Sequence, residues 1–225
     1  MLTRQAVLAA KVRTEMESRN ATQSHVIEDL AAMIESRDTG NDEHVGRTKK
    51  YVGRLTRAMQ NDPAFRDEIT DHLIDEIENA APLHDVGKIA ISDTILLKPG
   101  KLTKEEFEIV KTHTTKGSEM IRRIFSNLDD PHFLEIAEEI ALSHHEKWNG
   151  TGYPEGLSGT DIPLPARIMA VADVYDALIS ERVYKKAMDP KDALQVLYSE
   201  SGEHFDPDII RILKENGGPL LLKNP

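Results

Sequence analysis

Cysteine is absent from this chain of 225 residues. Disulfide bonds, thiolate chemistry and cysteine-type zinc fingers are therefore excluded. The sequence also has no apolar run close to the roughly 20 residues that cross a bilayer, so we expect no membrane span. No basic segment followed by an apolar one stands at Met1, as a secretory signal would require. These absences are typical of a cytoplasmic protein, and the cytoplasm is the location that we expect.

Positive charge is scarce as well. Lysine and arginine number 28 against 39 aspartates and glutamates, which gives a net charge of -11. Binding of polymeric DNA or RNA relies on lysine and arginine that neutralise phosphates, so we expect no nucleic acid polymer as a partner. A small anionic ligand remains compatible with this composition if cations gather at one site.

The alternating pattern of a half-buried strand is missing too, and so are internal repeats and low-complexity segments. Apolar residues instead recur at helical spacing almost throughout, which predicts an all-α fold. Thr103 and Glu106 form a capping-box pattern at the start of one helix. We expect helices over residues 5–36, 42–60, 67–82, 103–124, 131–146, 166–180, 190–200 and 207–216, and a loop rich in glycine and proline over 147–165.

We divide the chain into an N-terminal extension over residues 1–20 and one domain over residues 21–225. The first 20 residues are charged and poor in large apolar side chains. A solvated tag and a linker helix from a preceding domain both agree with this composition. A homodimer formed through this N-terminal helix is a further expectation.

Histidine and aspartate provide the candidate chemistry. His84 and Asp85 are adjacent, and Lys88 follows one helical turn later. Imidazole and carboxylate ligands suit divalent iron, manganese, zinc or nickel, and a carboxylate can bridge two cations. Two cations can activate water and stabilise both the attacking and the leaving oxygen of a phosphate ester. The candidate ligands are His44, His84, Asp85, His113, His144, His145 and Asp173.

Several segments resemble a known family. Residues 84–89 (HDVGKI) are similar to the HD motif of metal-dependent phosphohydrolases, and residues 144–154 (HHEKWNGTGYP) are similar to the extended signature of the HD-GYP subfamily. Residues 95–103 (ILLKPGKLT) and 168–178 (IMAVADVYDAL) also resemble this family. Further matches are Ser180, Arg182, Tyr184 and Lys185. The resemblance covers roughly residues 21–217.

The resemblance implies an HD-type helical bundle with a metal site at its centre. It also implies a phosphodiesterase that hydrolyses cyclic di-GMP to linear pGpG, and whether pGpG is cleaved further to GMP stays open. The seven candidate ligands would hold two divalent cations, iron or manganese first and zinc or nickel as alternatives. Asp85 would bridge the two cations and Asp173 would be a terminal ligand. We assign the catalytic role to Asp85 and Lys88.

The remaining site residues concern the substrate. Lys88 would place a positive charge on the phosphate oxygens rather than lie on the surface. Arg182 and Lys185 suit phosphate binding on one face, against the alternative of a solvated helix end. Tyr153 would contact substrate from a loop that, in the resembled family, also meets partner proteins. Asp176 would support a ligand or contact substrate.

Two details constrain the metal site. Family members with three metals usually carry a glutamate four residues before the first ligand histidine, but Gly40 occupies that position here. We therefore expect two metals. His144 and His145 point about 100° apart if both are helical. Both can be ligands only if the metals lie beyond the end of that helix. Otherwise one histidine binds the metal and the other contacts a ligand without binding the metal itself.

Two other functions remain open. The first is a nucleotide-binding signalling module that has little or no turnover and acts through the Gly-Tyr-Pro loop. The second is an HD phosphohydrolase of mononucleotides, against which the Gly-Tyr-Pro element and the Arg182/Lys185 pair argue.

Overall fold

A computed structural model of the chain describes residues 22, 24–37, 43–126, 130–181 and 186–216. This part of the chain is helical and contains no strand, with only an isolated bridge between Ser201 and Phe205. The prediction of an all-α fold is confirmed. None of the described helices combines the length and the hydropathy that a bilayer-spanning segment needs.

The described chain begins with a helical segment over residues 24–37. The α-helices that follow are α2 (Glu43–Gln60), α3 (Asp71–Ala80), α4 (Asp93–Leu96), α5 (Lys104–Lys111), α6 (His113–Phe125), α7 (Pro131–Ser143), α8 (Leu164–Ile179), α9 (Pro190–Ser199) and α10 (Pro207–Glu215). Short 3-10 helices are η1 (Ala81–Leu83), η2 (Val86–Ala90) and η3 (Gly159–Asp161).

Local sequence signals fix where several helices begin. Asp130, Asp189 and Asp206 each precede a proline, and each carboxylate accepts a hydrogen bond from a backbone N–H of the first turn. Proline suits this position because the first N–H groups of a helix have no partner within the helix. Thr103 and Glu106 form the predicted capping box at the start of α5.

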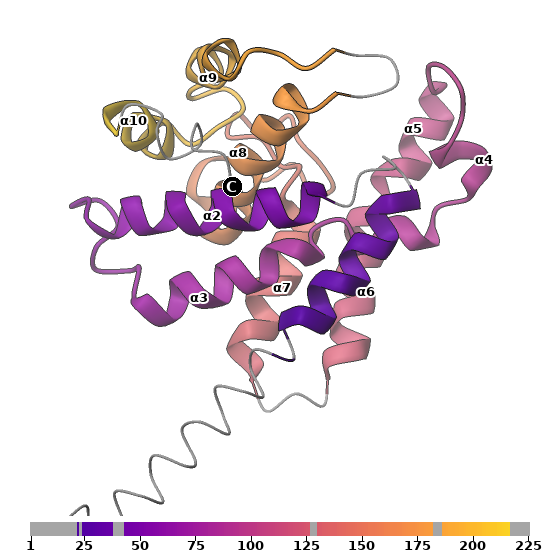
Figure 1. Cartoon of the computed structure of the whole chain (residues 1–225), viewed down its shortest axis with the longest axis horizontal. Coiled ribbons are helices and arrows are strands. Elements are labelled where there is room, and N and C mark those ends of the chain that lie inside the picture. The colour runs from indigo at the N-terminus through magenta and orange to yellow at the C-terminus, as the bar shows by residue number, and fades with distance from the viewer. Residues whose placement is uncertain (1–21, 23, 38–42, 127–129, 182–185, 217–225) are drawn as a thin grey trace, which may run out of the picture.

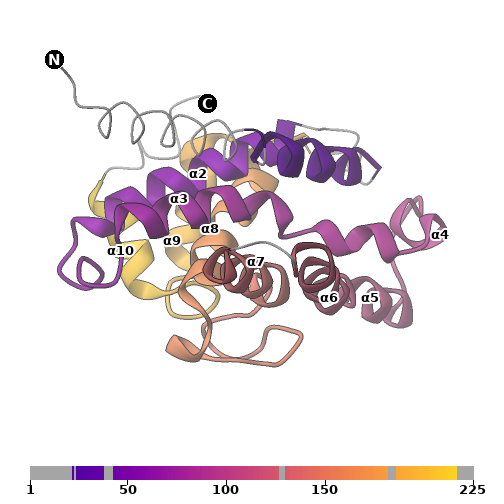
Figure 2. The ribbon, with the colours of Figure 1, turned by 90° about the horizontal axis from the view of Figure 1, so that it is seen from below.

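The core lies around α8. Helices α2 and α3 run side by side, with α8 behind α2 and α7 behind α3 (Figure 1). Ile168, Val171 and Tyr175 of α8 are fully buried. Burying one such apolar side chain stabilises the fold by roughly 1.5–3 kcal/mol. Helices α4 and α5 lie at one end of the molecule, α9 and α10 at the other, and α6 and α7 between them (Figure 2).

Three expectations about the helices need correction. The helix expected over 103–124 is interrupted at Thr112 and forms α5 and α6. The helix expected over 67–82 begins only at Asp71, where Thr70 caps it, and it tightens into η1 after Ala80. Neither α4 nor η2 was expected, because elements of four and five residues are too short to show periodicity.

Candidate metal centre

Six of the seven predicted ligands lie at or next to the ends of helices, and the seventh, Asp173, lies inside α8. His44 is the second residue of α2 and His113 is the first residue of α6. His84 and Asp85 form the joint between η1 and η2. The remaining ligands are His144 and His145, directly after α7, and Asp173 within α8.

Close packing of η2 against α6 holds this joint in place. A Cβ atom added to Gly87 would lie 1.9 Å from the backbone oxygen of His113. Only glycine therefore lets the segment that follows Asp85 approach the first turn of α6 this closely. The sequence Asp-Val-Gly-Lys is thus constrained by packing at Gly87.

The ligand atoms form two sets with Asp85 between them. In one set they belong to Asp85, His113, His144 and His145, and in the other to His44, His84 and Asp173, with all atoms of a set within 4.8 Å of one another. Oδ1 of Asp85 lies 3.2 Å from Nε2 of His113, and Oδ2 lies 3.3 Å from Nε2 of His84. Each carboxylate oxygen therefore faces a different set, as bridging of two cations requires.

Hydrogen bonds set the orientation of the imidazole rings. Nδ1 of His84 donates to the oxygen of Ala81, and Nδ1 of His144 donates to the oxygen of Ile140, both over 2.9 Å. Nδ1 of His113 donates in the same way to the oxygen of Val110 over 2.7 Å. Because a carbonyl only accepts, Nδ1 of each ring carries a proton, and Nε2 is the nitrogen that faces the centre.

Several buried polar atoms of the centre have no hydrogen-bond partner in the described part of the chain and could bind a cation. The Nε2 atoms of His84, His113 and His144, together with Oδ1 of Asp85, are buried and have no hydrogen-bond partner within the described residues. Leaving one buried polar atom unsatisfied costs roughly 1–3 kcal/mol. These atoms belong to both sets of ligand atoms, and a divalent metal in each set, which accepts lone pairs and needs no proton, would satisfy them.

The charges of the site residues oppose one another. Burial lowers the pKa of His84, but the carboxylates of Asp85, Asp173 and Glu35 together outweigh burial and raise the pKa to about 9. Burial and the neighbouring His84 lower the pKa of His144 to about 3. Asp85 itself resists protonation despite its burial, because Lys88 and His84 lower its pKa well below the usual value.

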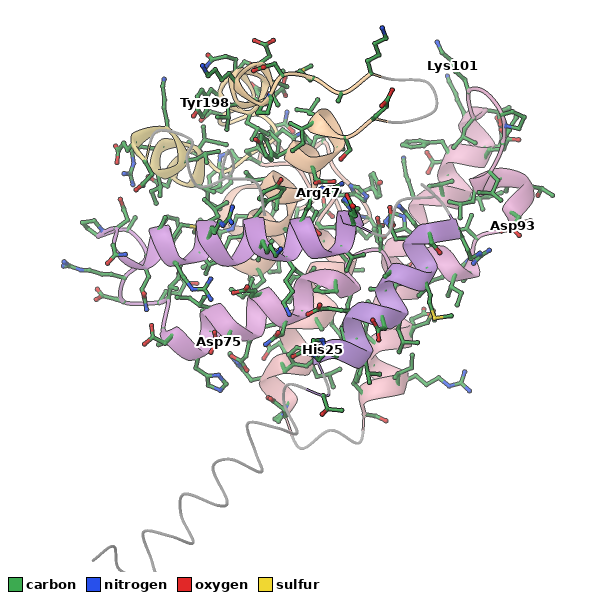
Figure 3. The ribbon with its side chains drawn as sticks, viewed as in Figure 1. His25, Arg47, Asp75, Asp93, Lys101 and Tyr198 are labelled. Carbon is green, nitrogen blue, oxygen red and sulfur yellow. The ribbon has the colours of Figure 1, made fainter. Side chains whose placement is uncertain are left out.

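Asp176 supports His44 from α8. Oδ2 of Asp176 accepts from Nδ1 of His44 over 2.7 Å, and Oδ1 accepts from Nε of Arg47 over 2.6 Å. Arg47 reaches from α2 toward α8 (Figure 3) and also donates to Oγ of Ser180. Asp176 is 1% exposed, and both its oxygens are engaged. These contacts favour the role of supporting a ligand over contact with substrate.

The sequence analysis missed Arg47 and Glu35. Glu35 is buried in the N-terminal helical segment, and its carboxylate belongs to a third group of ligand atoms within 4.8 Å, together with His44 and Asp85. A signal existed: Ile27, Ala31 and Ile34 mark the buried stripe of this segment, and Glu35 lies beside it. The expectation of two metals rested on Gly40, which has no side-chain ligand and lies outside the described residues. Glu35 provides a carboxylate that could hold a third metal instead.

Lys88 is part of the centre and is not a surface lysine. Its Nζ lies 2.8 Å from Oδ2 of Asp85 and 3.5 Å from Oε2 of Glu35. Its side chain is 14% exposed and lines a cavity of about 280 Å³ above the ligands. The apolar wall of this cavity consists of Ile95, Leu96, Leu102 and Val110.

The Gly-Tyr-Pro loop forms another wall of the cavity. The ring of Tyr153 lies 4.8 Å from that of His145, between ring centroids. Glu146 is buried and accepts from the backbone N–H groups of Glu155 and Gly156. The loop is also tied to the connection before α10, where the N–H of Trp148 donates to the oxygen of His204. Tyr153 is therefore held beside the ligands by several hydrogen bonds.

Two predicted substrate contacts, Arg182 and Lys185, lie outside the described residues.

Four histidines matched no motif. Of these, His25, His72 and His132 are exposed, and His204 stacks on Phe205. Asp173, the predicted terminal ligand, lies with Oδ1 3.7 Å from Nε2 of His44.

Comparison with known proteins points to one family. The family described as "HD domain" matches residues 25–209 of this chain. A protein of Vibrio cholerae named "Cyclic di-GMP phosphodiesterase" is 46% identical over 202 residues, which cover 87% of this chain and 41% of that protein. Another Vibrio cholerae protein, named "3'3'-cGAMP-specific phosphodiesterase 2", is 39% identical over 87% of this chain and 35% of its own length. This chain therefore spans less than half of these relatives.

A solved structure supports the fold. A cyclic GMP-AMP-specific phosphodiesterase of Vibrio cholerae matches 87% of this chain and 49% of its own, with a TM-score of 0.56 and 20% sequence identity. At this identity the match concerns the helical arrangement alone.

Proposed function

This chain belongs to the HD domain family and, through its Gly-Tyr-Pro signature, to the HD-GYP group within it, and from this premise we propose that it is a metal-dependent phosphodiesterase of cyclic di-GMP. The observation that carries the proposal is the position of Asp85, whose two oxygens face two separate sets of ligand atoms. A binding module has no need of this arrangement, whereas hydrolysis of a phosphodiester does.

The protein's own side chains have distinct tasks at this centre. The ligands named above would hold the cations, and Asp85 would lie between them. Bound cations would supply charge that activates water and stabilises the leaving oxygen. Lys88 holds a fixed ammonium group over the cavity, where it stabilises charge that grows on the phosphate oxygens. Arg47 and Asp176 hold His44 in register with the other ligands.

The substrate occupies the cavity beside the ligands. Tyr153 offers an aromatic face there, and the apolar wall formed by α4, α5 and the loop between them faces the ligands. Cyclic di-GMP has two phosphates, and only one can react at a time. We assign the second to Arg182 and Lys185, which follow the helix that carries Asp173. The first product is linear pGpG, and GMP is the product of a second cleavage.

We propose two cations, iron or manganese, with zinc or nickel as substitutes that the same ligands accept. The number of bound cations should be measured, because the carboxylate of Glu35 makes a third ligand group with His44 and Asp85. A third cation per chain in elemental analysis would assign Glu35 to the role expected of the glutamate missing at Gly40.

A substrate panel tests the activity. The metal-replete chain is incubated with cyclic di-GMP, 3'3'-cGAMP, linear pGpG and a cyclic mononucleotide, and products are separated by chromatography. We expect cyclic di-GMP to be hydrolysed fastest. Fastest turnover of 3'3'-cGAMP would move the chain to the specificity named for one of its relatives. Binding of cyclic di-GMP without turnover would favour the signalling module instead.

Several expectations about the whole protein stay predictions. They are the boundary near residue 20, a homodimer through the N-terminal helix, partner proteins at the Gly-Tyr-Pro loop, and the cytoplasmic location. The length of the relatives, more than twice that of this chain, agrees with a further domain beside the HD domain.

A further inference from the structure

A second cluster of ligand-type side chains lies away from the metal centre, where the first turns of α3 and α7 meet. His72 and Glu76 are one helical turn apart on α3, and His132 is the second residue of α7. Nδ1 of His132 lies 2.8 Å and Nδ1 of His72 lies 3.7 Å from the same atom, Oε2 of Glu76. Two imidazoles from two helices thus converge on one carboxylate.

Glu76 is the unusual member of this cluster. Its side chain is 5% exposed, and its Oε1 atom is buried with no hydrogen-bond partner within the described residues. A simple ion pair with His132 leaves this oxygen unsatisfied, and buried carboxylate oxygens are costly without a partner. A cation held by both oxygens resolves this cost.

The surroundings of Glu76 suit a cation. A cavity of about 260 Å³ opens beside it and is lined also by His72, Asp75 and Asp130. Asp75 lies on the outer side of α3 (Figure 3), and Oδ1 of Asp130 accepts from the N–H of Phe133. Two further carboxylates therefore line the same cavity and add negative charge that attracts a cation.

We propose that Glu76, His72 and His132 form a second site for a divalent transition-metal ion, which ties the start of α3 to the start of α7. Two imidazoles and one carboxylate are a ligand set that zinc, nickel, cobalt and copper accept. The ring centroids of the two histidines are 6.5 Å apart. One ring must turn to bring its nitrogen to a shared ion, and the side chain of His72, 77% exposed, has room to do so.

The position of this outer site gives the ion a structural role. Helix α3 leads through η1 to His84, and α7 ends directly before His144. Helix α7 has 13 residues, so its outer end lies about 20 Å from its ligand end. An ion at the outer site would join these two helices at a distance from the metal centre, without contacting the centre itself.

The test measures zinc binding by the full chain. Equilibrium dialysis against Zn²⁺ and elemental analysis give the ions bound per chain for wild type, for His72→Ala/His132→Ala and for His25→Ala, an exposed histidine outside both sites. We expect the double variant to bind about one Zn²⁺ fewer than wild type, and His25→Ala to bind as many as wild type. Because both variants keep the residues of the metal centre, this difference isolates the outer site.

Two single variants test whether a loss of Zn²⁺ in the double variant could come from unfolding. His72→Gln changes an exposed ring alone and should weaken Zn²⁺ binding at the outer site at least tenfold, and Glu76→Gln should abolish that binding. The turnover of the double variant with saturated metal centre should equal that of wild type, so the outcome is independent of the proposed activity. Equal Zn²⁺ content in wild type and double variant, or an equal loss in His25→Ala, would overturn the second site.

Discussion

Replacing Asp176 by asparagine should weaken cation binding without removing a ligand. Asn keeps the size of the side chain but loses the charge that Arg47 neutralises at 2.6 Å. Its amide oxygen can accept from Nδ1 of His44 or from Arg47, but it cannot serve both as the two carboxylate oxygens do. His44 thereby loses a fixed orientation, and Nε2 faces the cation for less of the time.

The magnitude follows from two independent estimates. Removing the partner of a ligating histidine typically costs 10- to 100-fold in metal affinity, or about 1.4–2.7 kcal/mol. One hydrogen bond to a charged group contributes about 1.5–3 kcal/mol. The two ranges agree, so we expect the dissociation constant of the cations to rise roughly 10- to 100-fold. The kcat at saturating metal should change much less.

Stability must be separated from metal affinity. Burial opposes the charge of Asp176, yet hydrogen bonds from Arg47 and His44 lower its pKa to about 2 from 3.8. This stabilisation is fully present above the unfolded value and is lost only as the pH falls through about 2. At neutral pH its loss in Asp176→Asn costs about 2 kcal/mol of unfolding free energy.

Asp206→Asn is the matched control. Asp206 is buried and pairs with Nη1 of Arg167 at 2.6 Å, but it lies at the start of α10 and contacts none of the ligands. Both variants are titrated with Mn²⁺ by calorimetry and melted in parallel. Asp206→Asn should lose stability only. An unchanged Mn²⁺ affinity in Asp176→Asn, with a loss of stability like that of the control, would refute the positioning role.

Four other changes test the centre and the substrate site. Asp85→Ala should abolish both metal retention and turnover, and normal metal content by elemental analysis would exclude the bridging role. Lys88→Ala should keep the metals but lower kcat about 10²- to 10³-fold, whereas an unchanged kcat would remove Lys88 from the chemistry. Arg182→Ala should lower kcat/KM for cyclic di-GMP roughly 10- to 150-fold and spare a small generic phosphodiester, and equal losses would assign Arg182 to the fold. Because the pKa of His84 is raised to about 9, a proton must leave before a cation binds, so metal affinity should rise up to tenfold per pH unit from pH 7 toward 9. A flat profile in calorimetric titrations would contradict this.

The sequence alone was enough to predict those parts of the fold that depend on local signals. The capping box of Thr103 and Glu106, the helical spacing and the absence of strands predict the all-α fold. Local signals fail where a helix ends for tertiary reasons. The break at Thr112 separates α5 from α6 and places His113 at the start of a helix, which no residue in this stretch indicates.

The ligands were predictable as residue types in a known order, but their support was not. Arg47 meets Asp176 across 129 positions of the chain. Glu35 meets His44 and Asp85 in space although it stands in a separate helical segment. Neither contact follows from periodicity, because periodicity tells which residues face inward and not what they meet there. Asp176 was predicted to lie at the site, and its contacts with His44 and Arg47 favour one of its two predicted roles.

Turnover of cyclic di-GMP measured against the number of cations bound per chain tests the central claim most directly. Metal-free protein is loaded stepwise with Mn²⁺, and the rate and the metal content are determined on the same samples. The account predicts no turnover without metal and a rate that rises with the second cation, when both ligand sets around Asp85 are filled. Full activity in metal-free protein, or a maximum with a single cation per chain, would contradict it.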